Sequence, residues 1–325
     1  MKTSVAMCTH NGEKFIKYQI ESILQQSLPI DEIVICDDGS NDKTIEIIQQ
    51  FQVDYPNKIF LHQNPINLGS NKNFEKAISI CKGDYIFLSD QDDIWKKNKA
   101  EKIIQFFSEN ETAEAVFSNA ELINDNNKKF TDNNLWNSIG FIENKLPKPI
   151  DLYHHIKFKS NTVTGATLCI KKEIKSLILP IPDIHKFHHD EWIAIITASR
   201  KKLEYLTDEL ISYRIHEEQQ IGAKGNLNKN RLKNHLTTAQ HIFNHTAPEK
   251  YLDYARLTRI YYRNYLKFKK VYNSIKDNSS VDFKEIAESN LDLFKKSNKS
   301  LKKSNPVFYF FRTLTDKIRG KRQLN

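Results

Sequence analysis

The stretch Tyr85-Ile86-Phe87-Leu88-Ser89-Asp90-Gln91-Asp92-Asp93 decides the fold. It opens with an apolar run typical of a buried strand, and three carboxylates follow at the strand's carboxyl end. Carboxylates this close together repel one another unless a cation offsets their charge. A divalent metal is the natural partner, because Mg²⁺ and Mn²⁺ prefer oxygen ligands and often keep a phosphate in their shell. The alternative, that Asp93 caps a helix beginning near Ile94, accounts for only one of these carboxylates.

Strands and helices alternate along the first part of the chain. Apolar runs predict strands over residues 4–7, 32–36, 58–62, 84–89 and 115–118. Apolar residues at helical spacing predict helices between them, over about 16–24, 45–48, 74–81 and 103–107. Such alternation predicts an α/β fold whose mostly parallel sheet has helices on both faces. The Asn-, Lys- and Pro-rich residues 124–160 predict a long loop or a small insertion near the site.

Three polar clusters fall where neighbouring strands end. They are Thr9-His10-Asn11-Gly12, Asp37-Asp38-Gly39-Ser40 and the carboxylates after Ser89. Ligands of parallel α/β sheets bind beyond the carboxyl ends of the strands, so these clusters predict one shared site. The chain has neither GxGxxG nor GxxxxGK[ST], which argues against a dinucleotide-binding fold and a P-loop NTPase.

Charge divides the 325-residue chain into two parts. Residues 226–325 carry 22 Lys and Arg against 8 Asp and Glu, whereas residues 1–225 are slightly acidic. From residue 226 the apolar pattern is helical. We therefore predict a catalytic domain over 1–225 and a helical, basic C-terminal region over 226–325. A basic surface of this kind indicates an anionic partner, either a membrane or a nucleic acid.

Two further features concern the compartment. No apolar run approaches the roughly 18 residues needed to span a bilayer, and Met1 leads almost at once into the first strand, without a signal peptide. The four cysteines are far apart in apolar surroundings, which predicts reduced core thiols and a cytosolic setting.

Six motifs in this order and spacing resemble the family 2 glycosyltransferases, which have the nucleotide-sugar-binding GT-A fold. The resemblance covers about residues 3–222, and its motifs are Val5–Gly12, Asp37–Ser40, Asn67-Leu68-Gly69 with Asn73, Asp90–Asp93, His189-Asp190-Glu191-Trp192 and Tyr213-Arg214-Ile215-His216. Within the family, the pattern is similar to bacterial rhamnosyltransferase-like enzymes of surface-polysaccharide assembly.

The resemblance implies a metal site that stabilises a departing diphosphate. Asp92 is the first choice for a direct ligand of Mn²⁺ or Mg²⁺, and Asp90 is either a ligand or a ribose contact. Asp93 is expected to cap a helix or to support the ligands. His216 is a third ligand or a diphosphate contact, although a lone histidine is more often structural.

The resemblance also implies a nucleotide pocket. Asp38 is expected to accept a hydrogen bond from the ring N–H of uracil or thymine, with Asp37 nearby, although one of the two carboxylates could serve only an Asx-turn. The other expected contacts to the nucleotide sugar are Thr9, Asn11, Asn67 and Arg214.

The general base is expected in the motif at His189-Asp190-Glu191-Trp192. Asp190 holds the family's place for the base, and Glu191 is the rival one residue away. A carboxylate near other acids in a partly dry cleft has a raised pKa, closer to the useful range. Trp192 either stacks on the acceptor sugar or belongs to the core. The loop Thr164-Gly165-Ala166 resembles a family loop near the acceptor.

The function implied is an inverting, metal-dependent transfer of a sugar from a UDP- or dTDP-sugar to a glycan hydroxyl. The acceptor is expected to be a glycan or a lipid-linked glycan of bacterial capsule, O-antigen or other surface polysaccharide. The aromatic and cationic residues after Pro306 predict contact with an anionic membrane, hence a cytoplasmic enzyme held peripherally on the inner face of the plasma membrane. A homodimer is also compatible with the sequence.

Two alternatives come from other classes. A nucleotidyltransferase acting on sugar phosphates also uses carboxylates and a metal, but it carries a basic Gly-rich loop after its first strand, where this chain has Thr9–Glu13. A non-enzymatic nucleic-acid-binding protein would use the basic tail but leaves the acidic clusters unexplained.

Overall fold

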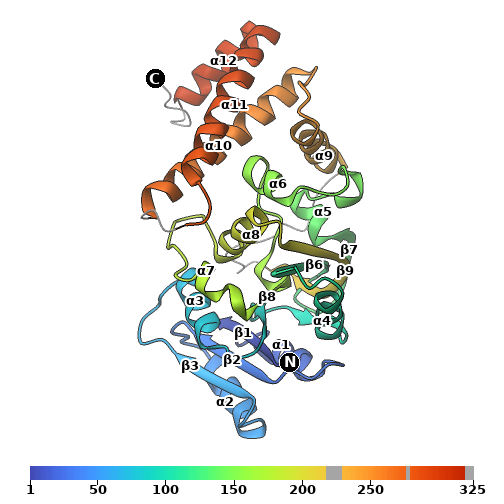
Figure 1. Cartoon of the computed structure of the whole chain (residues 1–325), viewed down its shortest axis with the longest axis vertical. Coiled ribbons are helices and arrows are strands. Elements are labelled where there is room, and N and C mark those ends of the chain that lie inside the picture. The colour runs from blue at the N-terminus through green and yellow to red at the C-terminus, as the bar shows by residue number, and fades with distance from the viewer. Residues whose placement is uncertain (217–228, 276–278, 319–325) are drawn as a thin grey trace.

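The computed structural model describes residues 1–216, 229–275 and 279–318. Within them, nine strands form one sheet in the order β3-β2-β1-β4-β8-β6-β9-β5, with β7 paired to β6. The strands are β1 (Thr3–Thr9), β2 (Glu32–Asp37), β3 (Ile59–Gln63), β4 (Tyr85–Ser89), β5 (Ile94–Trp95), β6 (Ala115–Ile123), β7 (Lys129–Asn134), β8 (Leu168–Lys171) and β9 (Leu203–Arg214). Figure 1 shows the sheet in the lower half of the molecule, with β3 and α2 at the end opposite the C-terminal helices.

Twelve α-helices accompany the sheet in the described residues. They are α1 (Ile16–Leu24), α2 (Thr44–Asp54), α3 (Ser70–Ile80), α4 (Lys99–Glu109), α5 (Leu135–Ile139), α6 (Leu152–Phe158), α7 (Lys175–Ile178), α8 (His189–Ser199), α9 (Lys229–Phe243), α10 (Tyr251–Ser274), α11 (Phe283–Ser304) and α12 (Pro306–Ile318).

Parallel pairing brings the predicted clusters to one edge. β1 pairs in parallel with β2 and with β4, and Thr9 lies opposite Asp37 where β1 and β2 end. The expected α/β fold with a mostly parallel sheet is confirmed for this half. The other half is mixed, because β8 runs antiparallel to both β4 and β6, whereas β6 and β9 are parallel.

Alternating side chains of the strands supply two cores. On one face, Val5, Met7 and Phe87 pack with residues of α1 and α4. On the other face, Ala6 and Leu88 pack with residues of α3 and α8. Successive side chains of each strand thus enter different cores. A parallel strand covered on both faces therefore needs apolar residues at every position, which explains the near-continuous apolar runs in the sequence.

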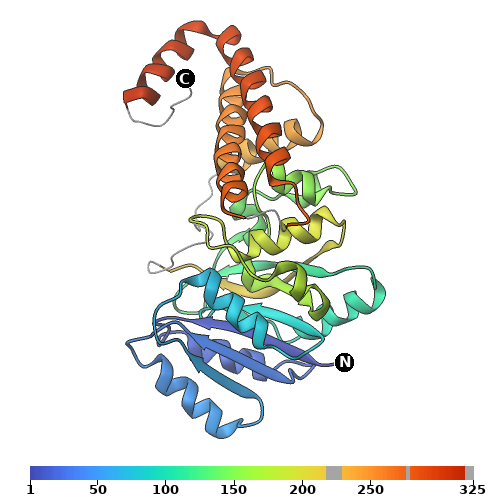
Figure 2. The same cartoon turned by 60° about the vertical axis from the view of Figure 1, so that its left-hand side comes forward.

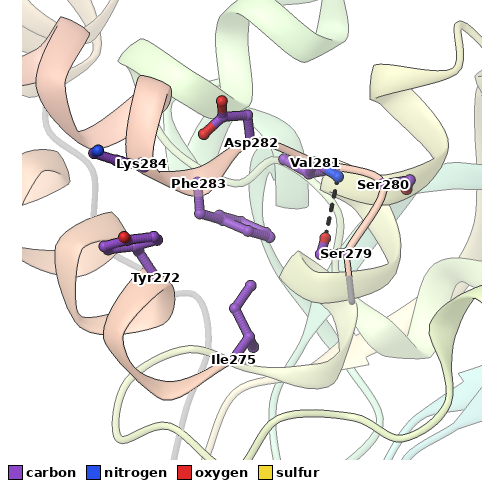
Figure 3. A pocket seen from close by; sticks show the side chains of 8 residues that line it. All are labelled: Tyr272, Ile275, Ser279, Ser280, Val281, Asp282, Phe283 and Lys284. Atoms are coloured by element: carbon purple, nitrogen blue, oxygen red, sulfur yellow. Dashed lines mark hydrogen bonds between the residues drawn. The ribbon is translucent and has the colours of Figure 1, made fainter. Parts of the chain in front are cut away.

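The second core extends into the C-terminal region. Phe268 of α10 and Phe283 of α11 belong to it, and the Phe283 ring stacks on Trp192 of α8 at 5.8 Å between ring centroids. The side chains of Tyr272, Ile275 and Phe283 border one hollow, where the chain turns from α10 to α11 (Figure 3). Figures 1 and 2 both show α10 and α11 as a long antiparallel pair standing above α8, with α12 at its far end.

The predicted elements have clear outcomes. All five predicted strands and all four predicted helices are present, as β1–β4, β6 and α1–α4, and the C-terminal region is helical as expected. Residues 124–160, predicted as a long loop or a small insertion, contain β7, α5 and α6, which excludes the loop and fits the insertion. The four cysteines are free thiols. The predicted boundary between residues 225 and 226 lies outside the described residues.

Candidate active site

A cleft of about 980 Å³ opens at the carboxyl ends of β1, β2 and β4. This volume lies at the upper end of the range typical of small-molecule sites. Its lining includes most of the residues predicted for the site, namely Thr9, Asn11, Asp38, Asn67, Asp90, Asp92, Asp190 and His216. Segments that are far apart in the sequence thus meet in one cleft, as the parallel topology requires.

Gln91, which lies in the loop after β4, fixes this loop to the loop after β1. Its side-chain amide accepts a hydrogen bond from the backbone N–H of His10 at 2.8 Å and donates to the carbonyl of the same residue at 3.0 Å. The backbone of Gly12 approaches Gln91 so closely that an added Cβ would lie 2.4 Å from its Oε1. A larger residue at Gly12 would therefore displace Gln91 and loosen the link between the loops after β1 and β4.

Asp92 and His216 lie next to each other on the lining of the cleft. Asp92 Oδ2 lies 2.9 Å from His216 Nε2, and both side chains are largely buried. Burial and the neighbouring Asp92 and Asp190 raise the pKa of Asp90 to about 7. Within the described residues, no three His, Cys, Asp or Glu side chains form a complete metal cluster. A carboxylate and an imidazole this close nevertheless fit a divalent cation whose remaining ligands are phosphate oxygens and waters.

Of the two roles expected for Asp93, the structure excludes the helix cap and fits a support of the ligands. Asp93 precedes the two-residue strand β5, and α4 begins only at Lys99. The side chain is 1% exposed, and its Oδ1 accepts the backbone N–H of Arg214 at 2.9 Å. Asp93 therefore joins the loop after β4 to the end of β9, which places His216 next to Asp92.

Arg214 is fully buried beneath the same loop. Its Nε donates to the carbonyl of Asp92 at 2.6 Å, and its Nη1 donates to the carbonyl of Asn124 at 2.8 Å. The guanidinium also lies 4.3 Å from the ring centroid of Phe15. These contacts place Arg214 as a support of the loop that carries Asp92.

Lys99 is a site residue that the sequence analysis missed. It is fully buried at the start of α4, and its Nζ donates to the carbonyl of Ala166 at 2.8 Å. Burial lowers the pKa of Lys99 to about 7, while Asp93 and Asp90 oppose that shift. The spacing of six positions between Asp93 and Lys99 did not predict that the two side chains are close. The course of the chain through β5 into α4 brings Lys99 near Asp93 and Asp90.

The two aspartates after β2 have different partners. Asp37 accepts hydrogen bonds from Thr9 Oγ1 at 2.7 Å and from the backbone N–H of Gly39 and Ser40, so its carboxylate holds the turn. Asp38 lines the cleft, and its carboxylate accepts the backbone N–H groups of residues 68 and 69 at 2.7 and 2.8 Å. Asp38 thereby fixes the loop that presents Asn67.

Asn11 and Asn67 hold neighbouring parts of the backbone along the cleft. Asn11 adopts a left-handed backbone conformation with φ of 51°, and its Oδ1 accepts the backbone N–H of Asn41 at 2.8 Å. Asn67 Nδ2 donates to the carbonyl of Asp38 at 3.0 Å. Both lie on the cleft lining, together with Thr9.

Asp190 lies in the first turn of α8 and lines the cleft. Its Oδ2 accepts the backbone N–H of Gly165 at 3.2 Å, which ties it to the predicted acceptor loop. Burial and the adjacent Glu191 raise the pKa of Asp190 to about 7. A carboxylate with such a pKa is suited to take a proton near neutral pH.

Glu191 has a different environment from Asp190. It is 6% exposed, and its Oε1 forms an ion pair with Lys267 of α10. The C-terminal region thus neutralises the second acid of the motif. Trp192 belongs to the core, because its Nε1 donates to the carbonyl of Ile178 at 2.8 Å and its ring stacks on Phe283.

A second hollow, of about 430 Å³, lies between the end of α10 and the start of α11 (Figure 3). Its lining includes two charged residues, Asp282 and Lys284. The Asp282 carboxylate caps α11 by accepting the backbone N–H of Glu285 at 2.8 Å. This hollow therefore marks a helix junction, and none of the residues predicted for the site is among its described lining residues.

The fold and cleft define a class of protein, the GT-A glycosyltransferases. TarS residues 1–349 from Staphylococcus aureus, solved with UDP-GlcNAc, superposes with a TM-score of 0.55 at 16% identity, covering 92% of this chain and 73% of that one. The mannosyltransferase PcManGT from Pyrobaculum calidifontis, solved with GDP-Man and Mn²⁺, gives 0.52 at 14% identity, covering 99% of this chain and 88% of that one.

The sequence comparisons identify the family. The model of Glycosyl transferase family 2 matches residues 4–162. A dTDP-rhamnosyl transferase, RfbG of Shigella flexneri, is 30% identical over 228 residues, which are 67% of this chain and 74% of that relative. This chain belongs to glycosyl transferase family 2.

Other relatives match over less of their length. A glycosyltransferase of unknown function from Nostoc is 27% identical over 66% of this chain, which spans 65% of that relative. A putative teichuronic acid biosynthesis glycosyltransferase, TuaG of Bacillus subtilis, is 34% identical over 34% of this chain and 43% of the relative.

Proposed function

We propose that this protein transfers a sugar from a UDP- or dTDP-sugar to a hydroxyl of a glycan or lipid-linked glycan, with inversion at the anomeric carbon. The observation that carries the proposal is the position of Asp190 in the same cleft as Asp92 and His216. A base on one wall and a diphosphate site on the floor are the two requirements of direct displacement.

In the proposed reaction, Asp190 accepts the proton of the acceptor hydroxyl. The hydroxyl oxygen forms the new bond to the anomeric carbon as the bond from that carbon to the diphosphate oxygen breaks, and the electron pair leaves with the nucleoside diphosphate. The N–H groups of Gly165 and Glu191, which donate to the two oxygens of Asp190, orient the carboxylate for this role.

We assign Asp92 and His216, with Asp90 beside them, to hold Mn²⁺ or Mg²⁺ together with the donor's diphosphate. When bound, the metal supplies positive charge that stabilises the departing diphosphate. Arg214 holds the loop of Asp92 in place through a hydrogen bond to the carbonyl of Asp92. That PcManGT was solved with Mn²⁺ supports the assignment.

The nucleotide is assigned to the side of the cleft formed by Asp38, Asn67, Thr9 and Asn11. UDP-GlcNAc in TarS and the dTDP-rhamnosyl activity in the name of RfbG support uracil or thymine as the base. Because Thr9 and Ser40 donate to the carboxylate of Asp37, we assign Asp37 to hold the turn after β2 rather than to contact the nucleotide.

We further propose that the product is a bacterial surface polysaccharide and that the enzyme acts at the inner face of the plasma membrane. Within the described residues, no helix is long and apolar enough to cross a bilayer. On α12, however, Val307, Phe308 and Phe310 are each more than 60% exposed. Residues 295–325 hold ten Lys and Arg against one Asp. Exposed aromatics beside cations suit an anionic membrane surface.

The test is release of nucleoside diphosphate from UDP-glucose, UDP-GlcNAc and dTDP-rhamnose, with Mn²⁺ and with membrane lipids of polysaccharide-producing bacteria as acceptors. We expect one donor to be consumed, with UDP or dTDP as product. Consumption of a nucleoside triphosphate and a sugar phosphate, with release of pyrophosphate, would instead identify a nucleotidyltransferase and overturn the proposal.

A further inference from the structure

One side of α10 carries a row of cations, Arg259, Arg263 and Lys267. They lie four positions apart, a spacing that makes them neighbours on one side of a helix. Arg259 and Arg263 are exposed, and Lys267 forms an ion pair with Glu191 on the lining of the cleft. One end of this cationic row therefore reaches the proposed active site.

The other end of the cationic row leads toward α12. Arg312 of α12 donates to the carbonyl of Ala255 at 3.1 Å, and Ala255 precedes Arg259 by four positions. The ring of Phe308 lies 5.9 Å from that of Tyr251, where α10 begins. Figures 1 and 2 show that α10 extends from its end near α12 to its end above α8. The row thus lies between the cleft and the helix proposed to contact the membrane.

The cations outnumber the acids that pair with them. Among the described residues, neither Arg259 nor Arg263 forms an ion pair, and Glu191 is the one acid paired with the row. Arg263 also donates to the carbonyl of the buried Lys159 at 3.4 Å, and burial and Arg263 lower the pKa of Lys159 to about 8. Like charges held close together repel one another unless an opposite charge offsets them. The excess of cations therefore indicates an anionic ligand.

The cationic row meets the cleft beside the proposed base. Glu191, which pairs with the row, directly follows Asp190. Arg263 contacts the backbone of Lys159, two positions before Asn161, and the Asn161 side chain donates to Asp190 Oδ1 at 3.3 Å. In the proposed reaction Asp190 takes the proton of the acceptor hydroxyl, whereas the donor's diphosphate is assigned to the metal site. An anion on the row therefore belongs to the acceptor.

We propose that the cationic row binds phosphate groups of the acceptor and so guides the acceptor hydroxyl to Asp190. This inference rests on the proposed function. Phosphate is the anion favoured here, because the planar guanidinium of arginine presents paired N–H donors that match two phosphate oxygens. The phosphate is either the diphosphate that joins a glycan to its lipid or a phosphate within the glycan chain, and the experiment separates these two sources.

The test measures anion binding to the full chain by calorimetry in EDTA, which leaves the proposed diphosphate site without its metal. The probes are farnesyl diphosphate, a lipid diphosphate, and a soluble oligomer of glycerol phosphate, which carries phosphates along its chain. We expect wild type to bind one probe, and Arg259→Gln with Arg263→Gln to bind it about tenfold more weakly, because charge-assisted hydrogen bonds are lost. The matched control, Lys295→Gln with Lys299→Gln, removes two exposed charges at the same spacing on α11 and should bind within about twofold of wild type.

Several results would overturn the inference. Wild type could bind neither probe, or both double variants could lose affinity equally, which would reflect net charge alone. The arginine variant could bind both probes like wild type but vesicles of phosphatidylglycerol more weakly, which would assign the row to the membrane surface. It could also lose UDP or dTDP binding in Mn²⁺, which would place the row at the donor site.

A single substitution keeps the test decisive if the double variant does not fold. Arg259→Gln alone, at an exposed side chain, should weaken binding of the probe about threefold. An unchanged affinity of Arg259→Gln would then contradict the inference. Failure of wild type to bind any nucleotide in Mn²⁺ overturns the proposed function itself, whereas the measurement in EDTA tests the cationic row alone.

Discussion

The residues of the motif at positions 189–192 divide their tasks according to their surroundings. Asp190 faces the cleft and accepts N–H groups from Gly165 and Glu191, whereas Glu191 is paired with Lys267. Both carboxylates border the cleft, but one oxygen of Glu191 is engaged by a lysine, whereas Asp190 accepts hydrogen bonds from N–H groups. This difference in environment favours Asp190 as the base, independently of its place in the family motif.

Substitution should separate these two acids. Asp190→Asn removes the base, and we expect donor turnover to fall about 10²- to 10⁴-fold. Glu191→Gln leaves Lys267 buried without its counter-charge, so its main effect should be a loss of about 3 kcal/mol of unfolding free energy. Steady-state turnover and urea unfolding measure the two effects. A larger loss of turnover in Glu191→Gln than in Asp190→Asn would exchange the assignments.

The pH profile follows from the raised pKa of Asp190. Burial and Glu191 raise the pKa of Asp190 to about 7, so its basic form is depleted below that pH. We expect kcat/KM to rise with pH and to level off above about 8, and to be about 100-fold lower at pH 5 than on the plateau. Because the pKa of Asp90 is raised to about 7 as well, we expect the inflection near pH 7 to become weaker in Asp190→Asn, and an unchanged inflection would contradict the assignment to Asp190.

The effect of the raised pKa of Asp190 on folding stability has the opposite dependence on pH. Because the folded state binds this proton more tightly, the contribution of Asp190 to stability falls as pH rises from about 4 to 7.

The sequence predicted the acidic residues that line the cleft better than the buried residues behind them. Asp90, Asp92 and Asp190 meet in one cleft with His216, as the motifs predicted. For Asp93 the helix cap was wrong, whereas the alternative of a residue that supports the ligands fits its hydrogen bond from the backbone of Arg214. Lys99 was missed because a lysine in a helical pattern normally reads as exposed.

At the scale of elements, the pair α10 and α11 is built into the catalytic half. Lys267 of α10 neutralises Glu191, and Phe283 of α11 stacks on Trp192 of α8. Both contacts reach the helix that carries Asp190. The C-terminal helices therefore buttress α8 and, through it, hold the proposed base.

Removing the Phe283 ring tests this buttress. The side chain is 1% exposed, and a Phe→Ala change in a core typically costs about 3 to 5 kcal/mol. We expect Phe283→Ala to lower the unfolding free energy by about that amount and to reduce donor turnover. The control is Phe310→Ala, at a ring that is 62% exposed, which should change stability by no more than about 0.5 kcal/mol. Similar urea midpoints for both variants would show that α11 does not support the catalytic half.

The elements that the sequence did not reveal share a physical cause. Central strands such as β1 and β4 are apolar at every position, which gives a strong local signal. β9 is long but carries several polar residues and follows a helix directly, and β8 has four residues, so neither stands out from its neighbours. Their places in the sheet depend on pairing with β6, a long-range contact that no local pattern records.

At the scale of the whole molecule, α12 lies at the opposite end from β3 (Figure 1). We expect the full chain to bind vesicles of phosphatidylglycerol and phosphatidylcholine, and to bind them more weakly as salt rises. Phe308→Ser with Phe310→Ser should weaken binding at least tenfold, because both rings are more than 60% exposed and available to the bilayer.

The matched control for the vesicle measurement is Phe60→Ser. Phe60 is an exposed phenylalanine on β3, at the other end of the molecule. It should bind like wild type. Equal sedimentation of all three proteins with vesicles, or no binding of wild type at low salt, would remove α12 as the membrane contact and leave the catalytic assignments unaffected.

The central claim is that the cleft at the strand ends binds a nucleoside diphosphate together with a metal on Asp92 and His216. Thermal stabilisation by UDP, dTDP, GDP and CMP, each with and without Mn²⁺, tests it most directly in wild type and Asp92→Asn. A ligand at 100 times its Kd adds about 2.7 kcal/mol of stability. We predict a Mn²⁺-dependent shift with UDP or dTDP that Asp92→Asn abolishes. A shift that is indifferent to Mn²⁺ and to Asp92, or no shift with any nucleotide, would contradict the account.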